Sequence, residues 1–310
     1  LIKAAQMTYL VDTGAYADIG PVLAKAIAVD CTGPYNIENV CCDALCVYTN
    51  HPYATSFRGF GHASSTFCVE RMLDKLAWKL KIDPLVLRGR NALLPDQFSP
   101  TMVKISRSNF GDLRVCLDKL RQLCNWDEGA RIELGHNKVR AKGLACFWKT
   151  SNSPTNAGSG AVVTLNANGT VKLNCGCVEY GPGMKTTMAQ ILSEKLQMNI
   201  DHIQVNLDVN TQYNPEHWKT VASLTTYMLG RAVIRAADDV LSQIKSLAAA
   251  VLKCQTEDLE VREERVFVRH EPTTFLHFKD VVHGYEYENG KAWGGQIIGR
   301  GSYTINGLTY

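Results

Sequence analysis

The sequence lacks several features that would place it in a broad functional class. Its longest uninterrupted apolar run, from Leu247 to Leu252, is far too short to span a bilayer, so no membrane segment is expected. The 33 lysines and arginines nearly balance the 30 aspartates and glutamates, for a formal net charge of +3. The basic residues are scattered and form no stripe interleaved with aromatic side chains. Nucleic-acid binding is therefore not expected.

Eleven cysteines are present, but their spacing fits no metal site. Cys41, Cys42 and Cys46 form one cluster, and Cys175 and Cys177 form another. Neither cluster has the paired two-residue spacings of zinc sites or the four-cysteine runs of iron–sulfur ligation. The odd total also argues against a complete disulfide framework. We therefore expect buried, reduced cysteines in a cytoplasmic protein.

Hydrophobic periodicity predicts mixed helices and strands in two parts. The first part, residues 1–140, should contain strands and helices in alternation, with a short helix that Asp83 caps. The best-defined helix carries apolar residues at the spacing of one buried face, namely Val69, Met72, Leu73, Leu76 and Leu80. The predicted strands cover 7–16 and 40–48, and the predicted helices cover 21–29, 63–81 and 110–123.

The second part, residues 141–310, begins after a charged, glycine-containing stretch over 126–142. It should open with a strand over 143–149 and continue with a hairpin whose turn is Asn-Ala-Asn-Gly at 166–169. A β-α-β unit, a long helix and a second hairpin around Glu263 should follow. Their predicted bounds are 186–196 and 203–209 for the helix and second strand of the unit, and 221–252 for the long helix.

The most distinctive segment is Phe57-Arg58-Gly59-Phe60-Gly61, just ahead of a predicted helix. Glycine lacks a Cβ atom, so the backbone can come close to a ligand there and adopt angles that other residues avoid. The guanidinium of Arg58 suits planar anionic groups, and the helix N-terminus offers unpaired N–H groups. The residues by themselves fit an anion-binding turn or a plain surface turn.

This segment resembles the FRGFG motif of the molybdenum hydroxylases, the xanthine dehydrogenase and aldehyde oxidase family. Two further segments, Val178 to Thr186 and Thr220 to Ser223, resemble the family in the same order. The resemblance implies an α+β fold of two mixed α/β subdomains that form a molybdopterin-binding domain. It also implies a molybdenum–molybdopterin cofactor, with the cytosine dinucleotide form as an alternative. The pterin dithiolene holds the metal in that family, so no protein metal ligand is expected.

The resemblance also implies which residues contact the cofactor and the substrate. Phe60 is expected on the substrate side, with Lys25, whose alignment requires a gap, and Asn152. The segment 150–154 around Asn152 is small and polar where purine-oxidising relatives place aromatic residues, which suggests a different substrate. The implied cofactor-binding residues are Phe57, Arg58, Gly59, Gly181, Gly183, Ala222 and Ser223.

Gly181-Pro182-Gly183 lies where a predicted strand leads into a helix, a geometry that holds phosphates and other anions. A lone Gly-X-Gly is more often a plain tight turn. Relatives commonly have glutamine in the middle position, and Pro182 has neither an amide donor nor a polar side chain. The side-chain contact to the pterin is therefore in doubt, while the shape of the loop is expected to remain.

The segment Thr220-Val221-Ala222-Ser223 enters the predicted long helix. Thr220 or Ser223 can cap that helix, which is a frequent structural role. The resemblance implies instead that backbone N–H groups at Ala222 and Ser223 contact the molybdenum centre and the pterin. Both interpretations are compatible, because the same amides do the capping and the binding.

Two elements of the family pattern do not occur in the sequence. The family uses a glutamate in a Gly-Glu pair as general base, and no such pair is present. A glycine-rich segment expected before the FRGFG motif is absent too. Both termini read as interrupted patterns, so we expect a fragment truncated at both ends that does not turn over by itself. No catalytic residue is assigned.

The sequence therefore predicts the molybdopterin-binding part of an oxidoreductase that hydroxylates a purine, another N-heterocycle or an aldehyde, with water as oxygen source. Iron–sulfur and FAD (flavin) sites are expected on other domains or subunits, and a homo- or hetero-oligomer is expected. One alternative is a non-catalytic cofactor-binding or assembly relative. Another is a phosphate-binding α/β protein built on Gly181 to Gly183, although the standard phosphate-loop and dinucleotide fingerprints are missing.

Overall fold

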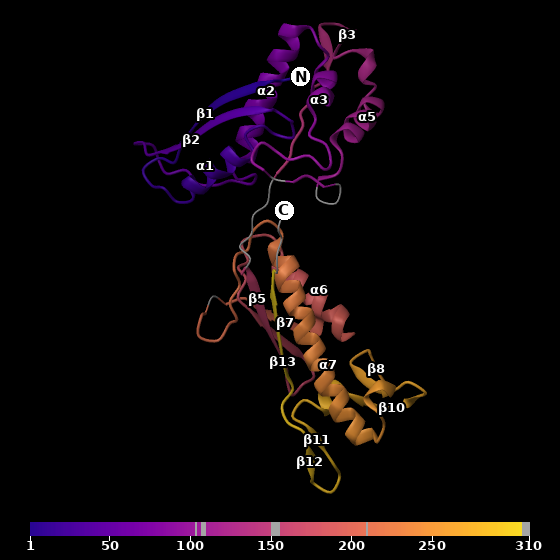
Figure 1. The fold of residues 1–310 in the computed structure, drawn as a ribbon. Coiled ribbons are helices and arrows are strands. Elements are labelled where there is room, and N and C mark those ends of the chain that lie inside the picture. The colour runs from indigo at the N-terminus through magenta and orange to yellow at the C-terminus, as the bar shows by residue number, and fades with distance from the viewer. Residues whose placement is uncertain (103, 107–109, 150–155, 209, 306–310) are drawn as a thin grey trace. The chain divides into compact units, whose positions relative to one another are not determined.

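A computed structural model describes residues 1–102, 104–106, 110–149, 156–208 and 210–305. The chain forms two compact units, Leu1–Asn152 and Ser153–Thr309, and each is described by itself (Figure 1). Each unit contains both helices and sheet, which confirms the predicted α+β class. Among the described residues, no helix is long and apolar enough to cross a membrane.

The first unit begins with a β-α-β arrangement. Strands β1 (Ala4–Asp12) and β2 (Asn39–Val47) pair in parallel without a register shift, from Ala4 opposite Asn39 to Asp12 opposite Val47. Helix α1 (Gly20–Val29) makes the crossover, with proline in its first turn, where no backbone donor is needed. Alternate residues of both strands are half-buried, so one face of the two-stranded sheet packs on the unit and the other is exposed.

Three helices complete the core of this unit. Helix α2 (His62–Leu80) confirms the predicted buried face in part: Leu73 is buried, while Met72 is exposed. Asp83 caps α3 (Pro84–Asn91) as predicted, because its carboxylate accepts the N–H groups of Leu85 and Val86 at 2.8 and 3.0 Å. Helix α5 (Leu113–Leu123) is capped in the same way by Asp112.

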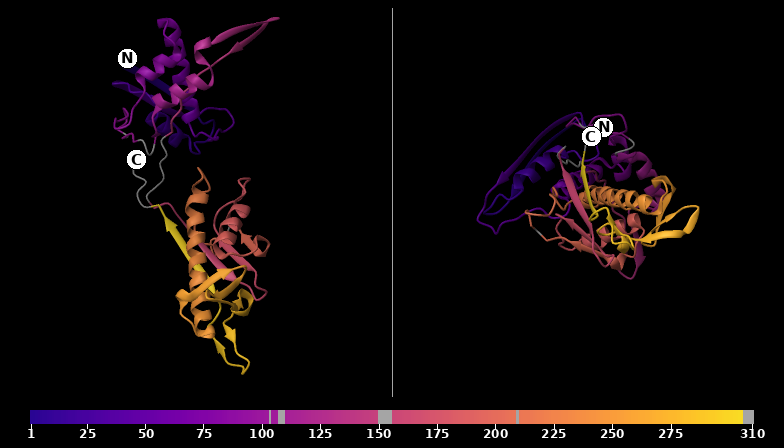
Figure 2. Two further views of the ribbon diagram at one scale, coloured as in Figure 1. Left: turned by 90° about the vertical axis from the view of Figure 1, so that its right-hand side faces the viewer. Right: turned by 90° about the horizontal axis from the view of Figure 1, so that it is seen from below.

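The charged stretch after α5, where the sequence analysis placed the division between the two parts, forms a 3-10 turn and a β-hairpin. A 3-10 turn, η1 (Trp126–Glu128), leads into a hairpin of β3 (Arg131–Gly135) and β4 (Lys138–Ala141), which projects from the unit (Figure 2). His136 and Asn137 form its turn with φ of +49° and +58°. The turn lacks the Asn-Gly or Asp-Gly signal that identifies such hairpins in a sequence.

The strand expected over 143–149 does not form, and this stretch packs against the first unit. Cys146 is buried in the same cluster as Tyr35, and its N–H donates to the Glu70 carboxylate at 3.0 Å. The described residues 142–149 therefore belong to the compact first unit.

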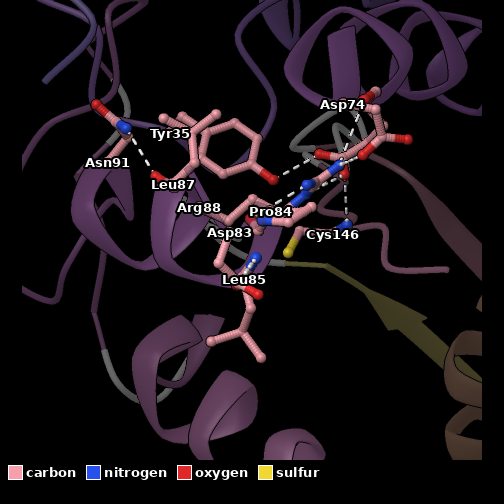
Figure 3. A network of polar contacts seen from close by, with 10 residues as sticks. Tyr35, Asp74, Asp83, Pro84, Leu85, Leu87, Arg88, Asn91 and Cys146 are labelled. Carbon is pink, nitrogen blue, oxygen red and sulfur yellow. Dashed lines mark hydrogen bonds and ion pairs between the residues drawn. The ribbon is translucent and has the colours of Figure 1, made fainter. Parts of the chain in front are cut away.

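Glu70 is the centre of a buried polar network, since its carboxylate accepts hydrogen bonds from Tyr35, Arg88 and the Cys146 backbone. Figure 3 labels these three partners. The Arg88 side chain is fully buried and donates from Nε to Glu70 at 2.8 Å and from Nη2 to Asp74 at 2.9 Å. The Tyr35 hydroxyl donates to the second Glu70 oxygen at 2.5 Å, and burial raises the pKa of this phenol far above its usual range. The network joins α2, α3 and the 142–149 stretch, because α2 supplies the carboxylate while Arg88 of α3 and the Cys146 backbone donate to it.

The second unit is built on a four-stranded sheet in the order β13-β5-β6-β7. The predicted hairpin and β-α-β unit are both confirmed, since β5 and β6 pair antiparallel and β6 and β7 pair in parallel around α6. Helices α6 and α7 pack on the sheet, and β13 runs beside α7 (Figure 1). The bounds are β5 Gly158–Leu165, β6 Val171–Cys175, α6 Met184–Leu196, β7 Ile203–Asn206, α7 Gly230–Leu252 and β13 Ile298–Thr304.

Alternation builds the core of this unit. In β5 every second residue is buried, so Ala161, Val163 and Leu165 share one face. They join the predicted apolar stripe of the long helix, of which Ala232, Ala236, Val240, Ile244 and Leu247 are buried. Helix α7 begins later than predicted, because a π-helical turn, η3 (Thr225–Leu229), precedes it.

A small antiparallel sheet caps the far end of α7. Strands β8 (Leu259–Arg262) and β9 (Arg265–Val268) form the hairpin predicted around Glu263, and β10 (Glu271–His277) adds a third strand that the sequence analysis missed. The remaining short elements are η2 Ile200–His202, η4 Thr256–Asp258, η5 Phe278–Asp280, β11 Tyr285–Glu286 and β12 Ala292–Trp293.

Candidate functional site

The Phe57 to Gly61 segment of the first unit is a compact turn with an unusual backbone. Gly59, Phe60 and Gly61 follow one another with φ of +111°, +47° and +79°. The Phe60 N–H donates to the Phe57 carbonyl at 3.0 Å and closes the turn. A non-glycine residue at positive φ is strained, so the fold holds Phe60 in place through its neighbours.

Glycine at position 61 is required by packing as well as by its backbone angle. A Cβ atom there would lie 3.1 Å from the Leu23 carbonyl oxygen and 3.1 Å from Cγ1 of Ile27, both in α1. Helix α2 starts immediately afterwards, and no side chain caps it. The turn therefore brings the N-terminus of α2 against α1 and leaves the Phe57 side chain 89% exposed, with Arg58 exposed beside it.

A buried contact between a histidine and an aspartate, which the sequence analysis missed, lies at the start of α2. His62 Nδ1 contacts the Asp30 carboxylate, and both side chains are at most 3% exposed. Asp30 ends α1 and His62 begins α2, so the pair fixes the two helix ends on either side of the turn. The two residues are 32 positions apart, so the contact leaves no local signal in the sequence.

In the second unit, the Gly181 to Gly183 turn is folded around the carboxylate of Glu179. The N–H groups of Gly181 and Gly183 donate to Oε1 at 2.8 and 3.1 Å, and those of Met184 and Lys185 donate to Oε2 at 2.5 and 3.4 Å. These hydrogen bonds hold the pKa of the Glu179 carboxyl below its usual range. The amides expected to receive an external anion therefore already hold one from the same chain.

The open side of this turn is formed by its glycines. Gly181 and Gly183 have φ of +120° and +80°, and a Cβ atom built on either would meet nothing within 4 Å. Pro182 between them is exposed. A flat ligand can therefore approach the backbone of the turn, but Pro182 offers it no donor.

The structure brings this turn together with the Thr220 to Ser223 segment. The Val178 N–H donates to the Thr220 hydroxyl at 3.1 Å, and the Tyr180 hydroxyl donates to the Thr220 carbonyl. Two of the three segments singled out in the sequence are therefore neighbours in one rigid part of the second unit. Figure 1 locates them at the N-terminal ends of α6 and of the π-helical turn before α7.

Ala222 and Ser223 have a strained backbone, with φ of +49° and +61°. Two adjacent non-glycine residues in the left-handed region cost roughly 1–2 kcal/mol each. Both residues are exposed, and within the described part of the chain their N–H groups donate no hydrogen bond. Strain and unused amides of this kind gather where a protein contacts a ligand. The π-helical turn that follows is a second feature common at functional sites.

A histidine with two hydrogen-bond partners holds the turn next to this strained segment. His217 Nδ1 lies 2.5 Å from the Ser159 hydroxyl, and its Nε2 lies 3.1 Å from the hydroxyl of Thr225 in the π-helical turn. Burial lowers the pKa of His217, so its neutral ring donates to one hydroxyl and accepts from the other. His217 thus ties β5 to the turn that positions Ala222 and Ser223. Its partner Ser159 lies 58 residues away in the sequence, so no spacing rule predicts this network.

Of the three expected substrate-side residues, the structure describes Lys25 and Phe60. Lys25 is exposed on α1, two positions from Leu23 and Ile27, whose atoms face Gly61, and so lies on the opposite side of that helix. Phe60 is half-buried, with its ring centroid 6.4 Å from that of His62. Asn152 lies outside the described residues.

The donor set fits a planar heterocycle held by backbone amides. Among the described residues, no group of three or more histidines, cysteines, aspartates and glutamates could hold a metal ion. What the second unit offers instead is the unused N–H groups of Ala222 and Ser223 and the open backbone over Gly181 and Gly183. Such donors suit a pterin, whose own sulfur atoms can hold a metal.

The chain is similar to several proteins of known sequence. It is 29% identical over 307 residues to the putative xanthine dehydrogenase molybdenum-binding subunit of Escherichia coli, an alignment that covers 97% of this chain and 40% of that protein. It is 29% identical over 243 residues to the aldehyde oxidoreductase of Megalodesulfovibrio gigas, covering 77% of this chain and 26% of that one. The chain thus spans less than half the length of these relatives.

Solved structures show the same fold. Quinoline 2-oxidoreductase from Pseudomonas putida matches 97% of this chain with a TM-score of 0.65 at 19% identity, over 41% of its own length. The CO dehydrogenase of Oligotropha carboxidovorans matches 97% with a TM-score of 0.63 at 21% identity, over 40% of its length. The model of a family described as "Molybdopterin cofactor-binding domain" matches residues 119–309, and a second model with that description matches residues 1–92. The chain therefore belongs to the molybdopterin cofactor-binding domains of the xanthine dehydrogenase and aldehyde oxidoreductase family.

Proposed function

We propose that this chain is the molybdopterin-binding part of an oxidoreductase that hydroxylates a purine, another N-heterocycle or an aldehyde. The observation that carries the proposal is the joined pair of segments in the second unit. Thr220 links the turn at Gly181 to Gly183 to the strained Ala222 and Ser223, whose amides are unused in the described structure. Both segments match the family in sequence and in order along the chain.

The residues of this chain would bind and orient the cofactor. We assign the N–H groups of Ala222 and Ser223 to hydrogen bonds with it, and the open faces of Gly181 and Gly183 to the backbone approach. We also propose the backbone of Phe57, Arg58 and Gly59 as cofactor-binding, on the resemblance of this segment to the family motif. When bound, the molybdenum cofactor supplies the two-electron oxidation and the oxygen that comes from water.

The general base and the electron acceptors would come from other parts of the parent protein. The names of several relatives describe subunits, as in the molybdenum-binding subunit of Escherichia coli. We therefore propose that iron–sulfur and flavin domains or subunits accompany this chain and that they receive the electrons. The proposed location is the cytoplasm.

The test is hydroxylation by the whole parent protein in water enriched in ¹⁸O, with an artificial electron acceptor. Candidate purines, N-heterocycles and aldehydes are supplied one at a time, and the product is examined by mass spectrometry. The proposal predicts one ¹⁸O atom per hydroxylated product. A product whose new oxygen comes from O₂ would contradict it.

One observation favours a second candidate, a non-catalytic relative that only carries the cofactor. Pro182 stands in the middle of the turn and supplies neither an N–H group nor a polar side chain. A parent protein that is fully loaded with molybdenum yet hydroxylates none of the three substrate classes would support this candidate. Turnover by the protein with Pro182 in place would exclude it.

A further inference from the structure

A cluster of two tyrosines and two arginines lies beside the π-helical turn of the second unit. The Tyr227 and Tyr303 rings meet edge to face with centroids 5.7 Å apart, and their hydroxyls are 3.2 Å apart. The Arg231 guanidinium lies over both rings, 4.8 Å from the Tyr227 centroid and 5.2 Å from that of Tyr303. Arg235 lies 5.2 Å from the Tyr303 centroid. We call these four residues the Arg–Tyr cluster.

Close packing between α7 and β13 builds the cluster. A Cβ atom on Gly301 would lie 2.1 Å from the Ala232 carbonyl oxygen, and one on Gly299 would lie 2.2 Å from that of Ala236. Only glycine allows the strand and the helix to touch at these points. Because they touch, Arg235 on the helix reaches the Ser302 carbonyl of the strand at 2.6 Å and stacks on Tyr303.

The two guanidinium charges of the cluster are uncompensated. Within the described residues, neither Arg231 nor Arg235 forms an ion pair. The nearest acids along the helix have other partners. Asp238 pairs with Lys195 at 2.6 Å, and Asp239 accepts hydrogen bonds from Gln243 and from the backbone N–H of Arg300. Like charges four residues apart on a helix repel, so Arg231 and Arg235 lower the stability of the protein when no anion is bound.

The arrangement leaves donors directed outward. A guanidinium that stacks on an aromatic face keeps its N–H groups at its edge, in the plane, where they match the oxygens of a phosphate. In the tyrosine pair, one hydroxyl donates to the other, so one phenolic hydrogen is left over. The stacking also limits the rotation of both arginines, which lowers the entropy lost when a ligand binds.

We propose that the Arg–Tyr cluster binds a phosphate-type oxyanion through Arg231, Arg235 and a tyrosine hydroxyl. The carboxylate surface of a protein partner suits this cluster less well, because both guanidinium groups lie by the same Tyr303 ring and one phosphate offers several oxygens to them. The inference does not depend on the proposed function, since it rests on the second unit alone. It concerns donors other than the N–H groups of Ala222 and Ser223.

The test is calorimetric titration of the protein with inorganic phosphate, pyrophosphate and phenyl phosphate, in chloride buffer of matched ionic strength. Saturable binding is expected. Arg231→Gln and Arg235→Gln should each weaken it about tenfold, the value of one charge-assisted hydrogen bond. Tyr303→Phe keeps the stacked ring and removes a hydroxyl, so it should weaken binding less than either arginine change.

Arg300→Gln is the matched control. Arg300 is exposed on the other side of β13, so this substitution removes the same charge away from the cluster. It should leave binding unchanged. Tighter binding of phenyl phosphate than of inorganic phosphate would identify a phosphorylated small molecule as the source, and the reverse order would identify free phosphate. Absence of saturable binding, or an equal loss with Arg300→Gln, would overturn the proposal. So would saturable binding of polyglutamate where all three phosphates fail.

Discussion

The carboxylate of Glu179 accepts hydrogen bonds from four backbone N–H groups, those of Gly181, Gly183, Met184 and Lys185. These groups belong to the turn, and the start of the helix after it, that were expected to hold an external anion. Glycines at 181 and 183 and the departure at Pro182 were visible in the sequence, and the turn forms where they indicate. The role of Glu179 was not visible, because a carboxylate two residues before a turn reads equally well as a surface side chain. At the residue scale, the N–H groups of the turn are therefore already bonded to a carboxylate of the same chain and do not form an empty anion site.

Glu179→Gln should reduce stability in a pH-dependent way. The hydrogen bonds lower the folded-state pKa of Glu179, so its contribution is complete above the unfolded-state pKa and is lost as pH falls through the folded-state value. The difference in Tm between the two proteins should be largest near neutral pH and should shrink below about pH 4, near the ordinary glutamate pKa. Thermal unfolding followed by circular dichroism across this range measures it. A difference that grows toward acid would contradict the assignment.

Gly61→Ala should destabilise the first unit by about 1–3 kcal/mol, from the positive φ and from contact with the Leu23 carbonyl. Gly143→Ala is the control, because a Cβ atom there meets nothing within 4 Å and its φ is not positive. Urea unfolding of both variants gives the two free energies. Equal values for the two variants would show that the turn does not depend on glycine at position 61.

At the scale of elements, periodicity identified most helices and the central hairpin because their buried faces repeat along the chain. Periodicity missed the elements whose residues have a low propensity for the structure that they form. Gly299 and Gly301 weaken β13 as a strand, yet they are what allows contact with α7. The β3–β4 hairpin turns at His136 and Asn137 without a glycine in its centre. The long helix begins later than predicted because Ala222 and Ser223 have left-handed backbones, which no propensity predicts.

Gly301→Ala should push α7 away from β13, because the new methyl would lie 2.1 Å from the Ala232 carbonyl. Overpacking of this kind costs about 1–3 kcal/mol and sometimes more. Gly295→Ala, with no atom within 4 Å of its Cβ, is the matched change nearby. The free energy of unfolding from urea titration should fall for the first variant alone, and an unchanged value there would refute the close contact.

Arg88→Met should lower the free energy of unfolding by about 3–5 kcal/mol, because it leaves the Glu70 carboxylate buried without its cation (Figure 3). Arg121→Met removes an arginine whose pair with Asp127 is exposed and screened by solvent, so it should cost far less than Arg88→Met. Chemical denaturation of the two variants side by side tests the contrast. Similar losses in both would mean that the buried network does not hold α2, α3 and the 142–149 stretch together.

At the scale of the whole molecule, the family and the fold class could be predicted from the sequence. The structure shows in addition which contacts hold the motif segments in place within each unit. The first unit packs the Phe57 to Gly61 turn on α1, with the His62 and Asp30 pair behind it. The second unit joins two segments through Thr220 and supports them through His217. Contacts such as these link residues far apart in sequence, so they lay beyond any reading of local pattern. Substrate and partners stay proposals, since the chain spans less than half of its relatives.

The most direct test of the account is the molybdenum and pterin content of the whole parent protein, produced in a host that makes the cofactor. Elemental analysis gives the metal, and fluorescence of the released, oxidised pterin gives the organic part. The account predicts close to one molybdenum and one pterin per chain. A folded parent protein that contains neither would contradict the claim that this chain is a working cofactor-binding domain.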